Sequence, residues 1–186
     1  MPDAPSPVLV RAATTSDAAV LAQVHVESWR AAYRGLVPQP HLDALSWEDR
    51  RDRWQGLLAQ SAADVTQNWV AVAAERVIGF ASLGPSRDPD ASAEVAELFA
   101  VYVRPDRWRG GVGSQLLRCA VVALPQHFRR VDVWVLEGNR AARDFYARCG
   151  FVADGGAKQI EIGGTWLAEL RYGVSRPLLA QRLDEA

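Results

Sequence analysis

The spacing of apolar residues divides the chain into helical and extended stretches. Between residues 14 and 33 apolar residues recur three or four positions apart, which predicts an amphipathic helix that Gly35 and Pro38 end. A second helix is expected to begin near Ser46, because Glu48 and Asp49 would lie in its first turn.

After residue 60 the pattern changes to short runs rich in β-branched residues. These runs predict strands at residues 69–73, 77–83, 95–103 and 131–136, and a similar run at residues 8–11 predicts a first strand near the N-terminus. Two further helices are expected at residues 112–124 and 140–149. Residues 151–174 predict two or three more strands, with turns at Gly155–Gly156 and Gly163–Gly164.

This order of elements predicts an α/β fold with a central mixed sheet of about seven strands and about four helices. The length of 186 residues fits one domain, which we expect at residues 8–186. Residues 1–7 contain three prolines and are expected to form a short disordered tail.

The charge balance excludes several classes of partner. Lys and Arg number 21 against 22 Asp and Glu, so we expect neither nucleic-acid binding nor attraction to an anionic membrane. No apolar run approaches the ~20 residues that span a bilayer, and the N-terminus lacks the pattern of a secretory signal, which favours a cytoplasmic protein. Cys119, Cys149 and three scattered histidines predict no metal site.

The most informative segment is ELFAVYVRPDRWRGGVGSQLL, residues 97–117. A strand runs into a turn with Gly110, Gly111 and Gly113, and a helix begins there. Free N–H groups at a helix N-terminus favour a phosphate or pyrophosphate, although an ordinary tight turn has the same pattern. The Walker A motif would need a lysine here, and the glycine spacing does not match the dinucleotide-binding fingerprint.

Residues 101–117, VYVRPDRWRGGVGSQLL, resemble the acetyl-CoA motif of the GNAT N-acetyltransferase superfamily. Residues 133–151, VWVLEGNRAARDFYARCGF, resemble the family's second motif, and residues 25–38, HVESWRAAYRGLVP, its first helix. The resemblance extends from Val8 to Tyr172. It departs at Trp108, where the family has Gln or Arg, with Arg107 and Arg109 on either side.

The resemblance implies a bulged strand in which backbone groups of Val101, Tyr102 and Val103 hold the acetyl group and pantetheine arm of acetyl-CoA. It implies that the pyrophosphate is held by Arg109, Gly110, Gly111, Val112, Gly113 and Ser114. Asn139 would contact the cofactor, cap the following helix, or do both. Tyr146, on the same helix face, would be the general acid for the leaving thiolate.

The attacking amine must lose a proton before it can react. Glu97 is the first candidate for the general base, with Glu94 and Glu137 as further candidates; each has an alternative interpretation as a surface carboxylate. Trp29 and Tyr33 are an i, i+4 pair that either packs in the core or forms a wall of the acceptor site. Trp47 and Trp54 fit the same two interpretations less well.

The sequence therefore predicts an acetyl-CoA-dependent N-acetyltransferase that transfers acetyl directly to a primary amine of a small molecule. A protein N-terminal or lysine acetyltransferase is the first alternative, and a catalytically silent acyl-CoA-binding module is the second. A homodimer is compatible with the exposed sheet edges that such a fold leaves.

Overall fold

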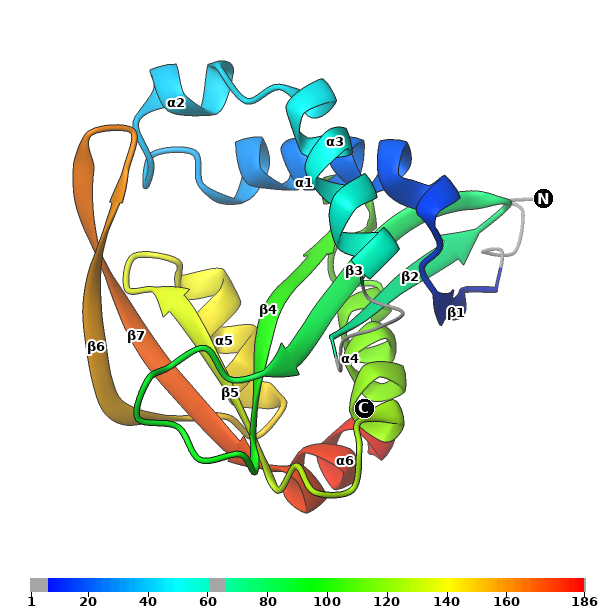
Figure 1. The fold of residues 1–186 in the computed structure, drawn as a ribbon. Coiled ribbons are helices and arrows are strands. Elements are labelled where there is room, and N and C mark those ends of the chain that lie inside the picture. Colours follow the sequence, from blue (N-terminus) through cyan, green and yellow to red (C-terminus); the bar gives the residue numbers. More distant parts are fainter. Residues whose placement is uncertain (1–6, 61–65, 186) are drawn as a thin grey trace.

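The structure is a computed structural model that describes residues 7–60 and 66–185 (Figure 1). Except for Pro7, the tail predicted at residues 1–7 lies outside the described residues. The described strands are β1 (Leu9–Ala12), β2 (Gln67–Ala73), β3 (Arg76–Pro85), β4 (Val95–Val103), β5 (Arg130–Leu136), β6 (Val152–Ile162) and β7 (Thr165–Ser175). The described α-helices are α1 (Ala18–Ala32), α2 (Gln39–Asp43), α3 (Trp47–Gln60), α4 (Val112–Ala123), α5 (Arg140–Arg148) and α6 (Arg176–Asp184).

The strands form one sheet in the order β1-β2-β3-β4-β5-β7-β6. Every neighbouring pair is antiparallel except β4 and β5, which run parallel because α4 connects them as a crossover. The predicted mixed sheet of seven strands is therefore confirmed.

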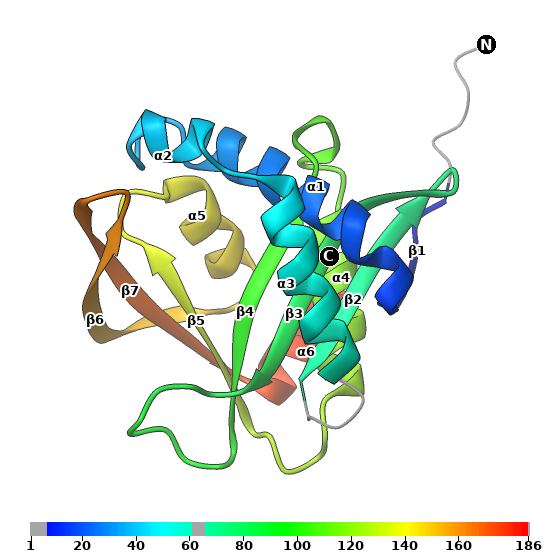
Figure 2. The ribbon, with the colours of Figure 1, turned by 45° about the horizontal axis from the view of Figure 1, so that its top comes forward.

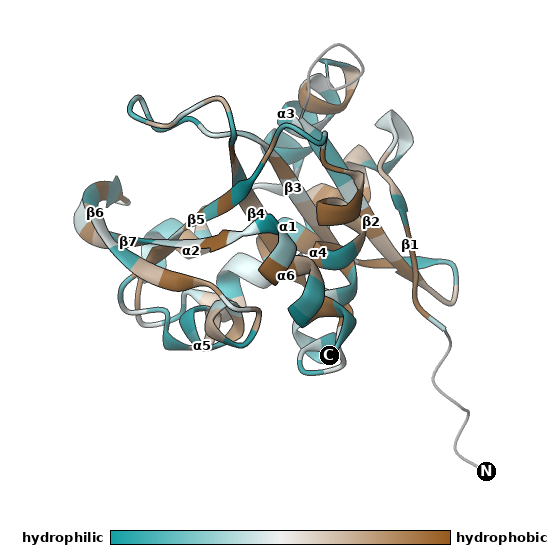
Figure 3. Cartoon of the chain, turned by 90° about the horizontal axis from the view of Figure 1, so that it is seen from below, coloured by the Kyte–Doolittle hydropathy of each residue, from teal (hydrophilic) through white to brown (hydrophobic). Residues whose placement is uncertain are grey.

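Helices cover both faces of the sheet (Figures 1 and 2). On one face α1 and α3 pack on β2 and β3 through Leu21, Trp54 and Phe80. On the other face α4 and α6 pack through a larger core that includes Leu117 and Leu179. Hydrophobic residues are dense on the central strands β2 to β4, which both layers cover (Figure 3).

The sequence prediction of about four helices missed α2 and α6. Helix α2 has only five residues, with Pro40 at its start, so its apolar pattern is too short to read. Packing decides its place, because His41 of α2 lies directly against Gly163 in the β6–β7 turn. A Cβ added to Gly163 would lie only 2.6 Å from Cβ of His41. The structure thus brings α2 against the tip of that hairpin.

The prediction of a turn at Gly155–Gly156 was wrong. Both glycines lie inside β6, where the register against β7 shifts between Ala153 and Ala157. A positive φ of 88° at Gly155 fits a bulge as well as it fits a turn, which is why the local sequence misled. The turn predicted at Gly163–Gly164 is confirmed as the β6–β7 hairpin.

Truncation of Leu117 to alanine is expected to lower the free energy of unfolding by about 2–5 kcal/mol. Leu117 is 0% exposed on the inner side of α4, so the variant Leu117→Ala would leave a cavity. The control is Val122→Ala on the outer side of the same helix, where the side chain is 68% exposed. Urea unfolding of both variants tests the prediction, and equal losses would contradict this placement of the core.

Candidate active site

Strands β4 and β5 separate after a short parallel contact. Only Val95–Glu97 of β4 pair with Arg130–Asp132 of β5, and β4 then continues along β3 while β5 continues along β7. Figure 2 shows the two strands crossing at one end and diverging toward the other. The backbone edge of β4 beyond Glu97 is therefore not hydrogen-bonded to a neighbouring strand on this side.

A β-bulge in β4 changes which residues face each layer. Leu98 pairs with Leu83 and Ala100 with Ser82, which leaves Phe99 as the extra residue. Leu98 and Val101 therefore both reach the core beneath α4, whereas Tyr102 lies on the α1 face. The resemblance placed the bulge among Val101, Tyr102 and Val103; the structure places it two residues earlier.

The backbone groups of Val101 and Val103 point into the space between β4 and β5. Arg104 donates its N–H to the carbonyl of Ile78 on β3 at 2.8 Å. Hydrogen-bonded pairs alternate in an antiparallel ladder, so Tyr102 bonds to β3 and its two neighbours face the other way. The Val103 carbonyl accordingly accepts bonds from Ser28 Oγ at 3.0 Å and from Trp108 Nε1 at 2.7 Å.

The glycine-rich turn at the end of β4 presents a run of free amides. Arg109 and Gly111 have left-handed backbones, with φ of 63° and 76°, and Val112 then begins α4. Within the described part of the chain, none of the six N–H groups from residue 109 to residue 114 has a hydrogen-bond acceptor; the first bond is from Gln115 to the Gly111 carbonyl. Such a concave run at a helix N-terminus binds anions, most strongly phosphates.

The side chains of this turn differ from the family pattern as the sequence indicated. Trp108 is 46% exposed and its indole N–H is used on Val103, so it offers no charge to an anion. Arg107 lies 3.6 Å from the carboxylate of Asp106, and Arg109 is exposed. The capacity to hold an anion therefore comes mainly from the backbone.

Helix α5 brings Asn139 and Tyr146 to the same side. Asn139 is 8% exposed and its side-chain oxygen accepts the N–H of Ala142 at 3.1 Å, which confirms the predicted N-cap. Tyr146 packs edge-on against Phe151 and its neighbour Phe145. A Cβ added to Gly113 would lie 3.3 Å from the Phe145 ring, so α5 adjoins the glycine-rich turn.

Three phenols meet where β4 and β5 diverge. The hydroxyls of Tyr33 and Tyr102 are 3.1 Å apart. Burial raises the pKa of Tyr146 well above its usual value, and the neighbouring Tyr33 raises it further. Burial and the nearby Tyr33 and Tyr146 likewise raise the pKa of Tyr102. All three phenols therefore keep their protons at neutral pH and can donate hydrogen bonds.

The aromatic pair on α1 borders this cluster. Trp29 and Tyr33 pack at a centroid distance of 4.7 Å, and the guanidinium of Arg50 lies 5.5 Å from the Trp29 ring centroid. Trp54 belongs to the core between α1 and β3, and Trp47 is 38% exposed. Of the four aromatic candidates, Tyr33 thus belongs to the phenol cluster and Trp29 packs directly against it.

His25 also contacts the phenol cluster, although the sequence analysis assigned it no role. Its ring stacks on Tyr102 at 5.1 Å, and neither ring nitrogen has a hydrogen-bond partner among the described residues. Burial lowers its pKa to about 3, so it is neutral at physiological pH. No motif pointed to this position, because a histidine on the inner face of a helix is also common in ordinary cores.

The predicted carboxylates differ in location. Glu97 is 4% exposed and accepts three bonds from Arg87: one from the backbone N–H at 2.9 Å and two from the guanidinium. Glu94 and Glu137 are exposed on the surface. Glu169 on β7 was not predicted from the sequence; it lies across from Leu136 of β5, and its charge raises the pKa of Tyr33 in addition to the effect of burial. Only the pairing of β7 with β5 brings it there, so no local signal could have found it.

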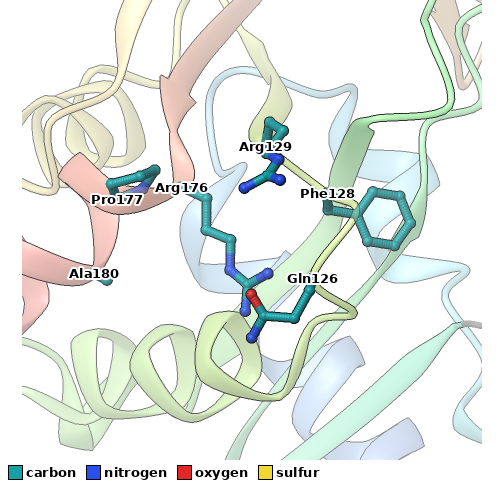
Figure 4. A pocket seen from close by; sticks show the side chains of 6 residues that line it. All are labelled: Gln126, Phe128, Arg129, Arg176, Pro177 and Ala180. Atoms are coloured by element: carbon teal, nitrogen blue, oxygen red, sulfur yellow. The ribbon is translucent and has the colours of Figure 1, made fainter.

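Two surface hollows of the described residues lie away from this site. One, of about 190 Å³, lies between the end of α4 and α6 (Figure 4) and is lined by Gln126, Phe128, Arg129, Arg176, Pro177 and Ala180. The other, of about 430 Å³, lies outside α5 beside Arg143 and Tyr172. Residues 7–60 and 66–185 contain no cluster of three metal-ligating side chains and no helix long and apolar enough to cross a membrane.

Comparison with known proteins agrees with this geometry. The family model described as acetyltransferase (GNAT) family matches residues 24–151, and the chain therefore belongs to the GNAT acetyltransferases. It is 35% identical over 136 residues to the uncharacterized N-acetyltransferase YuaI of Bacillus subtilis, an alignment that covers 71% of this chain and 73% of the relative. The protein is thus an N-acetyltransferase.

Two solved structures share the fold. The PaiA N-acetyltransferase of Thermoplasma acidophilum, in complex with coenzyme A, superposes with a TM-score of 0.70 at 22% identity, covering 88% of this chain and 98% of that one. The ribosomal-protein-alanine N-acetyltransferase of Brucella melitensis superposes with a TM-score of 0.71 at 25% identity, covering 90% and 99%.

The N-cap of α5 can be tested by stability. Asn139→Ala is expected to lower the free energy of unfolding by about 1 kcal/mol, because the Ala142 N–H loses its acceptor. Asn139→Ser is the control, since a serine hydroxyl can still cap. Urea unfolding measures both, and an equal loss in the two variants would show that the cap is not the stabilising contact.

Proposed function

We propose that the protein transfers an acetyl group from acetyl-CoA directly to a primary amine of a small molecule. The observation that carries this proposal is the run of six N–H groups from residue 109 to residue 114, which have no acceptor among the described residues and lie beside the open edge of β4. A diphosphate satisfies several such donors at once, and the positive end of the α4 dipole favours its charge. The solved complex of the Thermoplasma relative with coenzyme A supports the same ligand class.

Acetyl-CoA supplies a thioester whose carbonyl carbon an amine can attack. In this proposal Gly110, Gly111, Val112, Gly113 and Ser114, together with the Arg109 backbone, hold the pyrophosphate. The backbone groups of Val101 and Val103 hold the pantetheine arm, with Tyr102 fixing the strand on β3. An N–H that points into the space between the strands can polarise the acetyl carbonyl. Asn139 caps α5 and lies at the same end of the diverging strands.

Tyr146 is proposed as the general acid. Its phenol is buried and keeps its proton, and within residues 7–60 and 66–185 its hydroxyl has no hydrogen-bond partner. It can therefore donate to sulfur as the thiolate leaves. Two carboxylates, Glu97 and Glu169, lie on the α1 side of the sheet, from which the amine would approach, and both are candidates for its proton acceptor.

Packing on the acceptor side favours a small molecule. Val37, Leu42 and Leu136 form a cluster with Trp29, Tyr33 and Ile162, and this cluster joins α1, α2 and the β6–β7 hairpin. It closes one end of the space above β5, which would obstruct an extended peptide. The aromatic pair Trp29 and Tyr33 would then be a wall of the acceptor site, suited to a cationic or flat group.

A peptide acceptor is the second candidate, because a protein N-acetyltransferase of ribosomal-protein alanine shares the fold at 25% identity. Thiol release from acetyl-CoA over a panel of polyamines, aminoglycosides, amino acids and short peptides separates the two. Faster turnover of peptides than of every small amine would overturn the small-molecule proposal. No release with any acceptor would favour the silent acyl-CoA-binding module.

Calorimetry with coenzyme A tests the amide run. Ser114→Pro removes one N–H in the first helical turn, where proline is tolerated, and is expected to weaken binding about ten- to a hundredfold. Ser114→Ala keeps the N–H and removes only the hydroxyl, so its affinity should stay close to that of the unaltered protein. Absence of coenzyme A binding by the unaltered protein would refute the proposed function.

The general acid is tested by kinetics. Tyr146→Phe is expected to lower kcat by about 10²–10⁴ with little effect on the affinity for acetyl-CoA, because only the proton donor is lost. The matched control is Tyr172→Phe, which removes another buried phenol, one that accepts a bond from Arg143 Nε at 2.9 Å. An unchanged kcat in Tyr146→Phe would remove Tyr146 from the mechanism.

A further inference from the structure

Glu169 lies on the side of the sheet from which an acceptor would reach the reacting centre. On β7 its cross-strand neighbours are Leu136 of β5 and Lys158 of β6. Leu136 packs in the cluster with Tyr33. Burial raises the pKa of Tyr33, and the charge of Glu169 raises it further. Glu169 thus lies on the same side of the sheet as Leu136 and Tyr33, whose hydroxyl is 3.1 Å from that of Tyr102.

Glu97 and Glu169 differ in how firmly their oxygens are held. Both oxygens of Glu97 are bonded to Arg87, whose guanidinium also lies 4.2 Å from the ring centroid of Phe99. The one cation paired with Glu169 in the described part of the chain is Lys158, at 3.6 Å, which is longer than a hydrogen bond. The Nζ of Lys158 also lies 3.9 Å from the ring centroid of Trp134.

The charges around Glu169 suit it to accept a proton. Burial raises its pKa above the usual carboxylate value, and the negative charge of Glu97 raises it further; Lys158 and Arg87 act in the opposite direction. Tyr33, the residue directly after α1, is the phenol on which the charge of Glu169 acts. Its side chain is still 17% exposed, so a proton taken up there can pass on to water.

We infer that Glu169 binds the ammonium group of the acceptor and takes its first proton, and that Glu97 positions Arg87 and supplies negative charge. This inference rests on the proposed acetyl transfer. The N–H bond breaks and the proton moves to the Glu169 carboxylate, which later releases it to water. The freed lone pair forms the C–N bond to the acetyl carbon, and the C–S bond breaks. Sulfur takes the Tyr146 proton, and the phenolate recovers the second amine proton through water.

Two isomeric amines test this assignment without a change of size. Benzylamine is almost entirely an alkylammonium ion at neutral pH, whereas 4-methylaniline is a weak base that is already neutral. Glu169→Gln is expected to lower kcat/KM for benzylamine about 10²–10⁴-fold and to abolish the acid limb of its pH profile. For 4-methylaniline the loss should be less than about tenfold, because no ammonium proton has to be removed.

Glu161→Gln is the matched control, since Glu161 is exposed on β6 of the same hairpin. Glu97→Gln is the rival variant and should retain the acid limb. Three results would each overturn the inference. They are an equal loss of kcat/KM for the two amines in Glu169→Gln, an unaltered pH profile in that variant, and loss of the acid limb in Glu97→Gln instead. Failure of the unaltered protein to acetylate either isomer would overturn it as well. If calorimetry still shows coenzyme A binding in these cases, the proposed function survives and only the inference about Glu169 fails. If coenzyme A does not bind, the inference and the proposed function both fail.

Discussion

The divergence of β4 from β5 is the constraint on which the whole site depends. The two strands pair over only three residues each, and β4 then stays with β3. In a regular sheet the next strand would form hydrogen bonds with the backbone groups of Val101 and Val103. Backbone groups in the interior need hydrogen-bond partners. The Val103 carbonyl finds donors in Ser28 and Trp108, and a bound ligand can supply acceptors for the N–H groups.

The bulge at Phe99 complements this divergence. Glu97 and Tyr102 are five positions apart, which in a regular strand would place them on opposite faces. The extra residue puts both on the α1 face, where Glu97 meets Arg87 and Tyr102 meets Tyr33. One inserted residue thus gathers a carboxylate and a phenol beside the opening, while Val101 keeps its contact with the core beneath α4.

The two helices that flank the opening differ at their N-termini. Helix α5 begins with Asn139, whose side chain satisfies the Ala142 N–H. Helix α4 follows a left-handed glycine, and its first amides are unpaired among the described residues. The dipoles of both helices favour an anion, but among the described residues α4 keeps all of its first three N–H groups free, whereas most of those at the start of α5 are paired. This difference explains why a diphosphate would be bound at the glycine-rich turn.

The sequence by itself predicted a mixed sheet of about seven strands, the bounds of β4, the glycine-rich helix start and a cap at Asn139, because each depends mainly on neighbours within a few residues. It missed α2, whose five residues are too few for a period, and it misread Gly155–Gly156, because a bulge and a turn require the same backbone freedom. Only the tertiary structure decided that Arg87 bonds to both oxygens of Glu97, that His25 stacks on Tyr102, and that Glu169 lies on the same side of the sheet as Tyr33. Those contacts join strands and helices far apart in the chain, and burial by several elements at once sets their charges and pKa values.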